Sequence, residues 1–137
     1  MLMEALAKDF TIVLKDQPGT LAKATDAIAK AGVNIDGFCG FPVGNEGLFH
    51  ILCVKDAQKA RRAVEDAGFT VKNERDVVVL DGEDRPGFAA EIFKRIAAEE
   101  LNVDLTYLAT DTRIVIGGPE VTRIQKVVSE TPTAVRR

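Results

Sequence analysis

The sequence lacks both long apolar runs and an excess of basic residues. No apolar stretch approaches the length of about 18 residues that a transmembrane helix needs, which excludes a spanning segment. The first ten residues do not resemble a secretory signal, because an acidic residue comes early and no long apolar core follows. The chain has 18 Lys and Arg against 21 Asp and Glu, which disfavours a general nucleic-acid-binding surface. We therefore expect a cytoplasmic protein with neither a membrane nor a nucleic acid as partner.

Residues that usually carry catalysis are also scarce. His50 is the only histidine, and no Ser, Asp or Cys near it completes a catalytic set, so we expect it to be packed or at an interface. The sequence has no glycine-rich phosphate loop of either common type. The acidic run at residues 81–85 is too short for a calcium loop. We therefore predict no enzymatic activity, no cofactor and no metal site.

Only two cysteines are present, Cys39 and Cys53. Their scarcity, together with the missing signal, indicates a reducing cytosol in which both thiols are free. A hairpin centred near Glu46 would instead bring the two side chains face to face, so a cross-strand disulfide or metal pair is an alternative. Buried free thiols are the more common arrangement for two such cysteines.

What the sequence does contain is an internal repeat. The tetrapeptide Asp-x-Pro-Gly occurs at residues 16–19 and again at 84–87. At the same offset, Val-Asn-Ile-Asp at 33–36 aligns with Leu-Asn-Val-Asp at 101–104, and no gap is needed between the two matches. Chance is a poor explanation for two matches that share one register. The chain is therefore interpreted as a duplicated unit.

Each half has the same expected order of elements, βαββαβ. In the first half, alternation, capping residues and glycines predict a strand at 10–14, a helix ending at Gly32, strands at 34–41 and 48–54, a helix from Asp56 to Gly68, and a strand at 69–72. In the second half they predict a strand at 77–80, a helix after residue 87, a hairpin around 110–112, a helix at about 120–129 and a weak strand at 131–137. The glycine-rich stretch at 37–44 predicts a flexible or bulged strand, or a close approach by a ligand or partner.

The boundary between the halves falls near residues 73–76, which gives one domain of residues 1–75 and another of residues 76–137. Almost no linker remains, so the two small units are expected to pack together and supply burial that each lacks alone. In the strand at 48–54 both faces are apolar. Since only one face can carry the helices, the other is expected to meet another sheet or subunit.

The stretch DQPGTLAKATDAIAKAGVNI, placed after a strand and before a hairpin, a helix and a strand, resembles an ACT domain. The second half resembles another, and together the two resemblances cover about residues 8–130. The resemblance implies an α+β fold of two ferredoxin-like βαββαβ units packed side by side, with antiparallel sheets and helices on one face. The chain is similar to stand-alone tandem ACT proteins. The second copy departs from this pattern, because Ala89 stands where the first copy has Leu21.

ACT domains are regulatory modules that bind small molecules, typically amino acids, at interfaces between domains. The resemblance therefore implies a regulatory protein that binds a free amino acid and acts through an unidentified partner. The candidate ligand-binding residues are Asp16, Gln17, Pro18, Gly19, Thr20, Leu21, Asn34, Ile35, Asp36, Asp84, Arg85, Pro86, Gly87, Phe88, Asn102, Val103 and Asp104.

These residues cannot all meet within one repeat. The helix between residues 19 and 34 is expected to rise roughly 21 Å, which separates the Asp-x-Pro-Gly loop from Asn34. A head-to-tail arrangement would form two pockets instead, one from residues 16–19 with 102–104 and the other from residues 84–87 with 34–36. We treat this geometry as a hypothesis.

The chemistry of the loops suits an amino acid. Backbone N–H groups at a helix start can hold a carboxylate, the glycines allow close approach, and the aspartates can accept hydrogen bonds from an ammonium group. The asparagines can donate and accept. Arg85 could clamp an acid, whereas Gln17 could form only neutral hydrogen bonds, so the two pockets should differ in preference.

Two alternatives stay open at this point. Asp-x-Pro-Gly is also a good helix start, with Asp as the cap and Pro in the first turn. The chain could accordingly be an assembly module without a ligand that uses its apolar sheet face. An enzyme on the same fold, such as a phosphatase, would need a phosphate cradle or nucleophile that the sequence does not show.

Because the strand at 48–54 is apolar on both faces, we predict that the protein forms a homo-oligomer, most simply a dimer. Sedimentation at roughly tens of micromolar should give a mass above the 14.8 kDa of one chain. A single monomeric species at that concentration would contradict the prediction.

Overall fold

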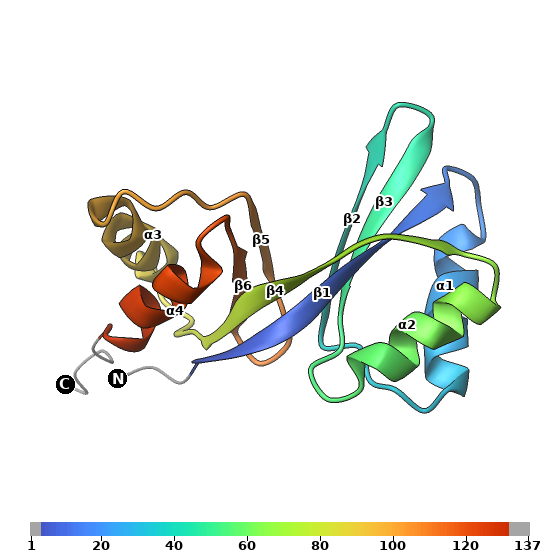
Figure 1. Cartoon of the computed structure of the whole chain (residues 1–137), viewed down its shortest axis with the longest axis horizontal. Coiled ribbons are helices and arrows are strands. Elements are labelled where there is room, and N and C mark those ends of the chain that lie inside the picture. Colours follow the sequence, from blue (N-terminus) through green and yellow to red (C-terminus); the bar gives the residue numbers. More distant parts are fainter. Residues whose placement is uncertain (1–3, 132–137) are drawn as a thin grey trace. The chain divides into compact units, whose positions relative to one another are not determined.

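The computed structural model describes residues 4–131 and has an α+β architecture with antiparallel strands (Figure 1). Its elements in chain order are β1 (Glu4–Lys15), α1 (Thr20–Lys30), β2 (Gly37–Val43), β3 (Glu46–Leu52), α2 (Ala57–Asp66), β4 (Thr70–Asp81), α3 (Phe88–Ala98), β5 (Leu105–Leu108), β6 (Arg113–Gly117) and α4 (Val121–Ser129). In this described range, no helix is long and apolar enough to cross a membrane.

The chain divides into two compact units, which are described separately. Residues 7–75 form the N-terminal unit, whereas residues 4–6 group with the chain from residue 76 onward in the C-terminal unit. The sequence assigned residues 1–75 to one domain, so the start of β1 is grouped differently from that expectation. Strands β1 and β4 each contribute residues to both units.

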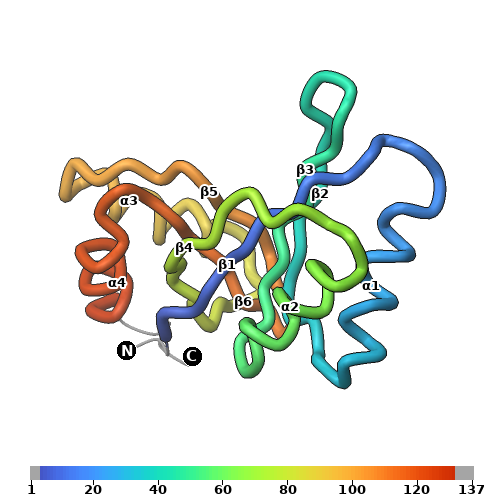
Figure 2. The backbone as a smooth tube through the Cα atoms, turned by 45° about the vertical axis from the view of Figure 1, so that its right-hand side comes forward, coloured from blue at the N-terminus to red at the C-terminus, as the bar shows by residue number. Residues whose placement is uncertain are grey.

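The N-terminal unit has the strand order β2-β3-β1-β4 and carries α1 beside α2 (Figures 1 and 2). Alternate residues of β1 and β3 face the helices, since Phe10 pairs with Ile51 and Ile12 pairs with Phe49. These four side chains are at most 2% exposed and pack with residues of both helices in one core. The period of two along each strand thus buries one face against the helices, as the sequence pattern indicated.

The C-terminal unit contains the strand order β4-β6-β5 with α3 beside α4. Its core consists of buried residues from β4, β6, both helices and the segment after α3: Val78, Leu80, Phe88, Ile92, Ile96, Leu101, Ile114, Ile116, Ile124 and Val128. Gln125 of α4 donates a hydrogen bond to Glu4 at the start of β1, with Nε2 and Oε2 2.8 Å apart. This bond links α4 to the part of β1 that groups with the unit.

Several sequence predictions are confirmed. Gly32 and Gly68 follow the C-caps of α1 and α2 with φ of 76° and 96°, values that glycine adopts without strain. The second hairpin turns at residues 110–112, and α4 covers nearly the predicted 120–129. The weak strand predicted at 131–137 lies outside the described residues, apart from Thr131.

Other predictions differ from the structure. Helix α1 has 11 residues, so it rises about 16 Å rather than 21 Å. The strands predicted at 69–72 and 77–80 are one continuous strand, β4. The first hairpin turns at Gly44 and Asn45, because Val43 pairs with Glu46.

The position of this turn determines which residue lies opposite Cys39 across the hairpin. Cys39 pairs across the hairpin with His50, not with Cys53, so the register rules out a cross-strand disulfide between the two thiols. Both thiols are free, and Cys53 is buried in the core of the N-terminal unit. Burial raises the pKa of Cys53 to about 12, with smaller contributions from the carboxylates of Asp36 and Asp56.

Cys53 should consequently resist thiol reagents while the protein is folded. We expect a Cys39→Ser variant to react with iodoacetamide at pH 8 roughly a hundredfold more slowly when native than when unfolded in urea, because the thiolate is the nucleophile. The matched Cys53→Ser variant retains the half-exposed Cys39 and should react much faster in the native state. Equal native rates for the two variants would contradict the burial of Cys53.

Candidate functional site

The loop between β1 and α1 holds itself together through backbone and hydroxyl contacts. Thr20 donates from Oγ1 to the carbonyl of Lys15 at 2.9 Å and to that of Gln17 at 3.2 Å. Gly19 is the N-cap of α1 and has a left-handed backbone with φ of 93°. No side chain caps this helix, so the interpretation of Asp16 as the cap is wrong. The first-turn N–H groups therefore have neither an intrahelical partner nor a side-chain cap.

A groove of about 580 Å³ lies beside this loop. Its lining comes from the loop, the first turns of α1 and the β2–β3 hairpin, all within the N-terminal unit: Leu14, Lys15, Asp16, Gln17, Pro18, Gly19, Thr20, Leu21, Ala22, Thr25, Phe38, Gly40, Phe41, Pro42, Gly47, Leu48 and Phe49. All six predicted site residues of the first loop, Asp16 to Leu21, line it. The volume is typical of small-molecule sites.

The hairpin side of the groove is aromatic. The rings of Phe38 and Phe49 lie 5.5 Å apart between centroids at an angle of 54°. Phe49 is 2% exposed and belongs to the core, whereas Phe38 is 60% exposed. Gly40 pairs with Phe49, and a Cβ added there would lie 3.2 Å from the Phe49 ring. Glycine at this position thus keeps the floor of the groove open.

A second hollow, of about 610 Å³, lies on the other side of the same loop. It is bordered by Lys15, Lys23 and Glu46 and by the turn that precedes β4. The Nζ atom of Lys23 lies 5.5 Å from the centre of the Phe69 ring, a cation–π geometry that occupies this side chain. The lining of this hollow contains Lys15, Lys23 and Glu46 among mostly uncharged residues, whereas the groove on the hairpin side is mainly apolar.

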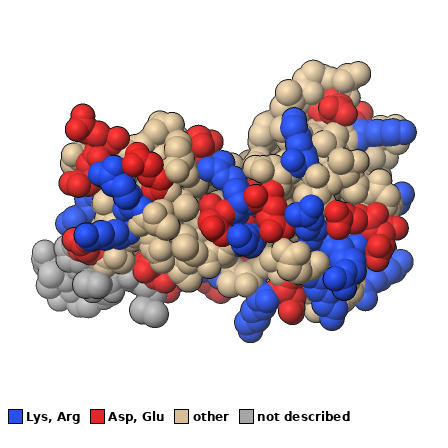
Figure 3. Space-filling view, viewed as in Figure 1, with Lys and Arg blue, Asp and Glu red and all other residues tan. Residues whose placement is uncertain are grey.

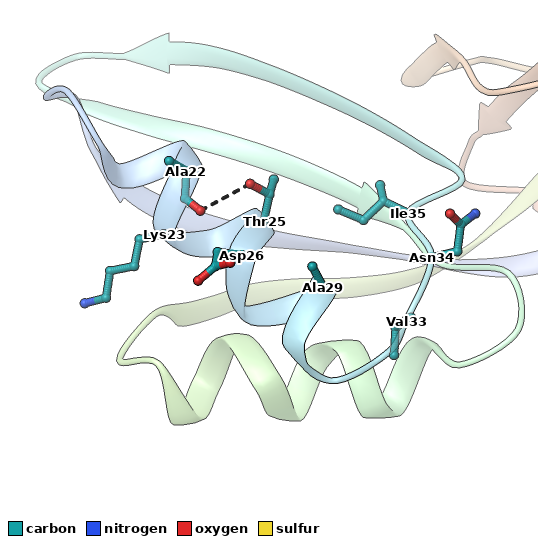
Figure 4. Close-up of a pocket in the computed structure, with 8 residues that line it drawn as sticks. All are labelled: Ala22, Lys23, Thr25, Asp26, Ala29, Val33, Asn34 and Ile35. Atoms are coloured by element: carbon teal, nitrogen blue, oxygen red, sulfur yellow. Dashed lines mark hydrogen bonds between the residues drawn. The ribbon is translucent and has the colours of Figure 1, made fainter.

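Asn34, Ile35 and Asp36 lie past the opposite end of α1. Figure 4 shows Asn34 and Ile35 with residues of α1 around a shallow hollow of about 810 Å³, which shares Ala22 and Thr25 with the groove but not the loop itself. Asp36 has a structural role in this segment. Its Oδ2 accepts a hydrogen bond from the N–H of Val54 at 2.8 Å, and its Oδ1 accepts one from the side-chain amide of Asn34 at 3.3 Å. The two predicted segments of the first repeat therefore line different hollows.

The second loop differs from the first despite the shared tetrapeptide. Gly87 has a φ of 88° and caps α3 as Gly19 caps α1. Phe88, the counterpart of Thr20, is 3% exposed and packs in the core of the C-terminal unit. Arg85 donates to Glu91 and to Glu83, both at 2.9 Å, and lies 5.3 Å from the centre of the Phe88 ring.

These contacts give Arg85 a local role. Hydrogen bonds to Glu91 and then Glu83 raise the pKa of the guanidinium above its usual value. An arginine that already bonds two carboxylates has less capacity to clamp an acidic ligand, which was the role suggested by sequence. Asp84 and Pro86, on either side of Arg85, are exposed.

The segment at 102–104 is held mainly by its backbone. The N–H of Asp104 donates to the carbonyl of Gly117 at 3.0 Å, and Val103 packs against the core. A Cβ added to Gly118 would lie 2.4 Å from the carbonyl oxygen of Asn102, so glycine is required for this close approach. The side chains of Asn102 and Asp104 are exposed.

Sequence reasoning missed the groove residues of the hairpin. Phe38, Gly40, Phe49 and their neighbours were not among the predicted site residues, although the glycine-rich stretch at 37–44 raised the possibility of a close approach by a ligand. Cross-strand pairing was needed to see that Gly40 lies opposite Phe49.

On the face drawn in Figure 3, basic and acidic side chains are interspersed rather than gathered in a basic stripe.

Gly19 and Gly87 both have a left-handed backbone, so replacing either one by alanine is expected to lower the stability by a similar amount. A Cβ at Gly19 or Gly87 would meet no atom within 4 Å, so the cost of alanine is purely conformational. We expect Gly19→Ala and Gly87→Ala each to lower the free energy of unfolding by about 1–2 kcal/mol, as measured by urea denaturation. A neutral effect at either position would contradict the left-handed geometry there.

Comparison with known proteins gives structural neighbours only. No model of a known protein family matches the sequence, and no curated protein matches it. The chain is similar in structure to a Bacteroides thetaiotaomicron protein whose name states no function, with 26% identity, a TM-score of 0.80, and coverage of 93% of this chain and 89% of that one. It is also similar to the ligand-free regulatory subunit of aspartate kinase from Thermus thermophilus, with 21% identity, a TM-score of 0.68, and coverage of 94% and 95%. A match to aspartate kinase from Clostridium acetobutylicum has 18% identity and a TM-score of 0.56 and covers 91% of this chain but 32% of that enzyme. The neighbours thus include regulatory subunits of aspartate kinase, and they share the fold of this chain.

Proposed function

We propose that this chain is a regulatory protein built from two ferredoxin-like ACT units, and that it binds a free amino acid at the loop of residues 16–21. The observation that carries this proposal is the groove of about 580 Å³ beside that loop, where the uncapped start of α1 meets an open apolar surface. The groove therefore has a polar end beside an apolar end. Such a groove suits a ligand that carries charged groups at one end and a side chain at the other.

The polar end offers partners for both charges of an amino acid. First-turn N–H groups of α1 carry partial positive charge and can bind the carboxylate, and Lys15 lies in the same lining. Asp16 is exposed and can accept hydrogen bonds from the ammonium group. Gly19 presents backbone without a side chain in the way of the ligand.

The second loop is proposed to be mainly structural. Phe88 fills the core and Arg85 bonds its own neighbours, so this loop stabilises the C-terminal unit rather than holding a ligand. The arrangement of the loop at 16–19 with residues 102–104, and of the loop at 84–87 with residues 34–36, stays a prediction. If the first of these pairs forms, the exposed side chains of Asn102 and Asp104 would contribute to the first pocket.

The regulatory part of the proposal is supported by size and likeness. The match to the regulatory subunit from Thermus thermophilus covers almost all of both chains, so this chain has the dimensions of a separate regulatory subunit. We propose that it acts without catalytic activity of its own, in the cytoplasm, as a homo-oligomer that influences another protein. Binding would act by favouring one packing arrangement over another.

A second candidate function rests on the exposed side chains of β2. Phe38, Phe41 and Val43 are 60%, 43% and 52% exposed, and β2 is the outer strand of the N-terminal unit. Outer strands with exposed apolar side chains favour association with another chain. An assembly module that binds no amino acid would use this surface alone.

A thermal-shift screen over the free amino acids separates the two functions. A ligand at about 100 times its Kd adds roughly 2.7 kcal/mol to the free energy of unfolding, which should raise Tm by several degrees. Gly19→Ala should abolish or greatly reduce that shift, because its methyl group enters the space next to the loop. Gly87→Ala is the matched control, with a similar stability cost and an unchanged shift.

Two results would count against the proposal. A flat screen across all the natural amino acids would favour the assembly module. A shift that is lost equally in both glycine variants would show that the first loop is not the specific site.

A further inference from the structure

The groove at the first loop is chemically divided. Among the residues that line it, the charged side chains are Lys15 and Asp16, and both lie at the loop end. The hairpin end is formed by aromatic and aliphatic carbon, with Phe38, Phe41 and Phe49 as its aromatic members. Charge is therefore confined to the end where the ammonium and carboxylate of an amino acid would bind.

The hydroxyl groups in the lining are already engaged. Thr20 donates to two carbonyls of the loop, and Thr25 donates to the carbonyl of Leu21 at 2.9 Å and of Ala22 at 3.3 Å. Neither proton is left for a polar group on a ligand. A ligand side chain with a charge or a hydroxyl would lose water at the hairpin end, where the lining offers no charged side chain and no free hydroxyl proton in exchange.

The apolar end is also exposed in a way that favours an occupant. Phe38 and Leu21 are 60% and 51% exposed, although their neighbour Phe49 is buried. Gly40 leaves open the space over the Phe49 ring that a longer side chain would fill. In the second repeat the residue at the position of Gly40 is Leu108, which lies on β5 and pairs with Ile114. The first repeat alone thus combines a glycine floor with an aromatic wall.

We propose that the amino acid held at this groove has a large apolar side chain, aliphatic or aromatic, which lies against Phe38 and over the ring of Phe49. This inference rests on the proposed function and specifies its ligand class. The loop recognises the charges common to all amino acids, and the hairpin selects the side chain. Threonine, lysine and aspartate are disfavoured because the hairpin end offers their polar groups no charged side chain and no free hydroxyl proton.

Equilibrium binding by calorimetry on the whole chain tests the proposal, with leucine, phenylalanine, alanine, threonine, lysine and aspartate as the probes. Leucine or phenylalanine should bind about tenfold to a hundredfold more tightly than alanine or threonine, since burial of a large apolar side chain supplies the difference. Phe38→Ser should reduce binding of the apolar ligand about tenfold and leave alanine unchanged. Because Phe38 is largely exposed, this variant should fold normally.

Two further variants sharpen the test. Leu108→Ser removes a leucine that is 73% exposed and does not line the groove, so it should alter none of the affinities. Phe38→Glu places a carboxylate at the apolar end and should shift the preference from leucine towards lysine.

The outcomes distinguish this inference from the function on which it rests. Tightest binding of lysine, threonine or aspartate, or an equal loss for leucine and alanine in Phe38→Ser, would overturn the inference and leave amino-acid binding intact. Absence of binding for every amino acid would overturn the proposed function as well. If Phe38→Ser dissociates an oligomer in sedimentation and leaves amino-acid affinities unchanged, a second copy of the chain covers the groove and the inference is wrong.

Discussion

The left-handed backbone at Gly19 is the constraint on which the first loop depends. It turns the chain from β1 into α1 without using a side chain as the cap. The cap position would otherwise be filled by Ser, Thr, Asp or Asn, whose oxygen would satisfy one of the first N–H groups. Without that oxygen, the start of α1 keeps its donors for another acceptor. The hydroxyl of Thr20 then stabilises the loop from within, so the loop keeps its shape with an open groove beside it.

The two repeats show how one tetrapeptide can serve two purposes. Both glycines adopt nearly the same φ, and both helices begin directly after them. The residue after each glycine then makes the two loops different. Thr20 donates a hydrogen bond to the loop backbone, whereas Phe88 is buried in the core. Burial of this phenylalanine contributes to the stability of the C-terminal unit. The duplication has therefore kept the turn in both copies and the open groove in the first.

The continuity of β1 and β4 gives the proposed regulation a physical basis. Each strand contributes residues to both compact units, so β1 and β4 both run from one unit into the other. Lys15 ends β1 next to the loop of residues 16–19, while Glu4 at the other end of the same strand accepts a hydrogen bond from Gln125 of α4. A ligand that prefers one arrangement of the loop would bias whichever packing that arrangement favours, by no more than its difference in affinity.

Local sequence patterns determined the repeat, the order of the elements and the glycines that end α1 and α2, because each of these depends on residues close together in the chain. They also indicated that one face of the strand at 48–54 must carry the helices, but because both of its faces are apolar they did not indicate which. The tertiary structure decided what pairing controls. A turn at Gly44 and Asn45 places Gly40 opposite Phe49 and Cys39 opposite His50, and a shift of one residue would have reversed both faces. The groove exists because of that register, and the sequence could not reveal it, since no local pattern states which residues of two strands will lie across from each other.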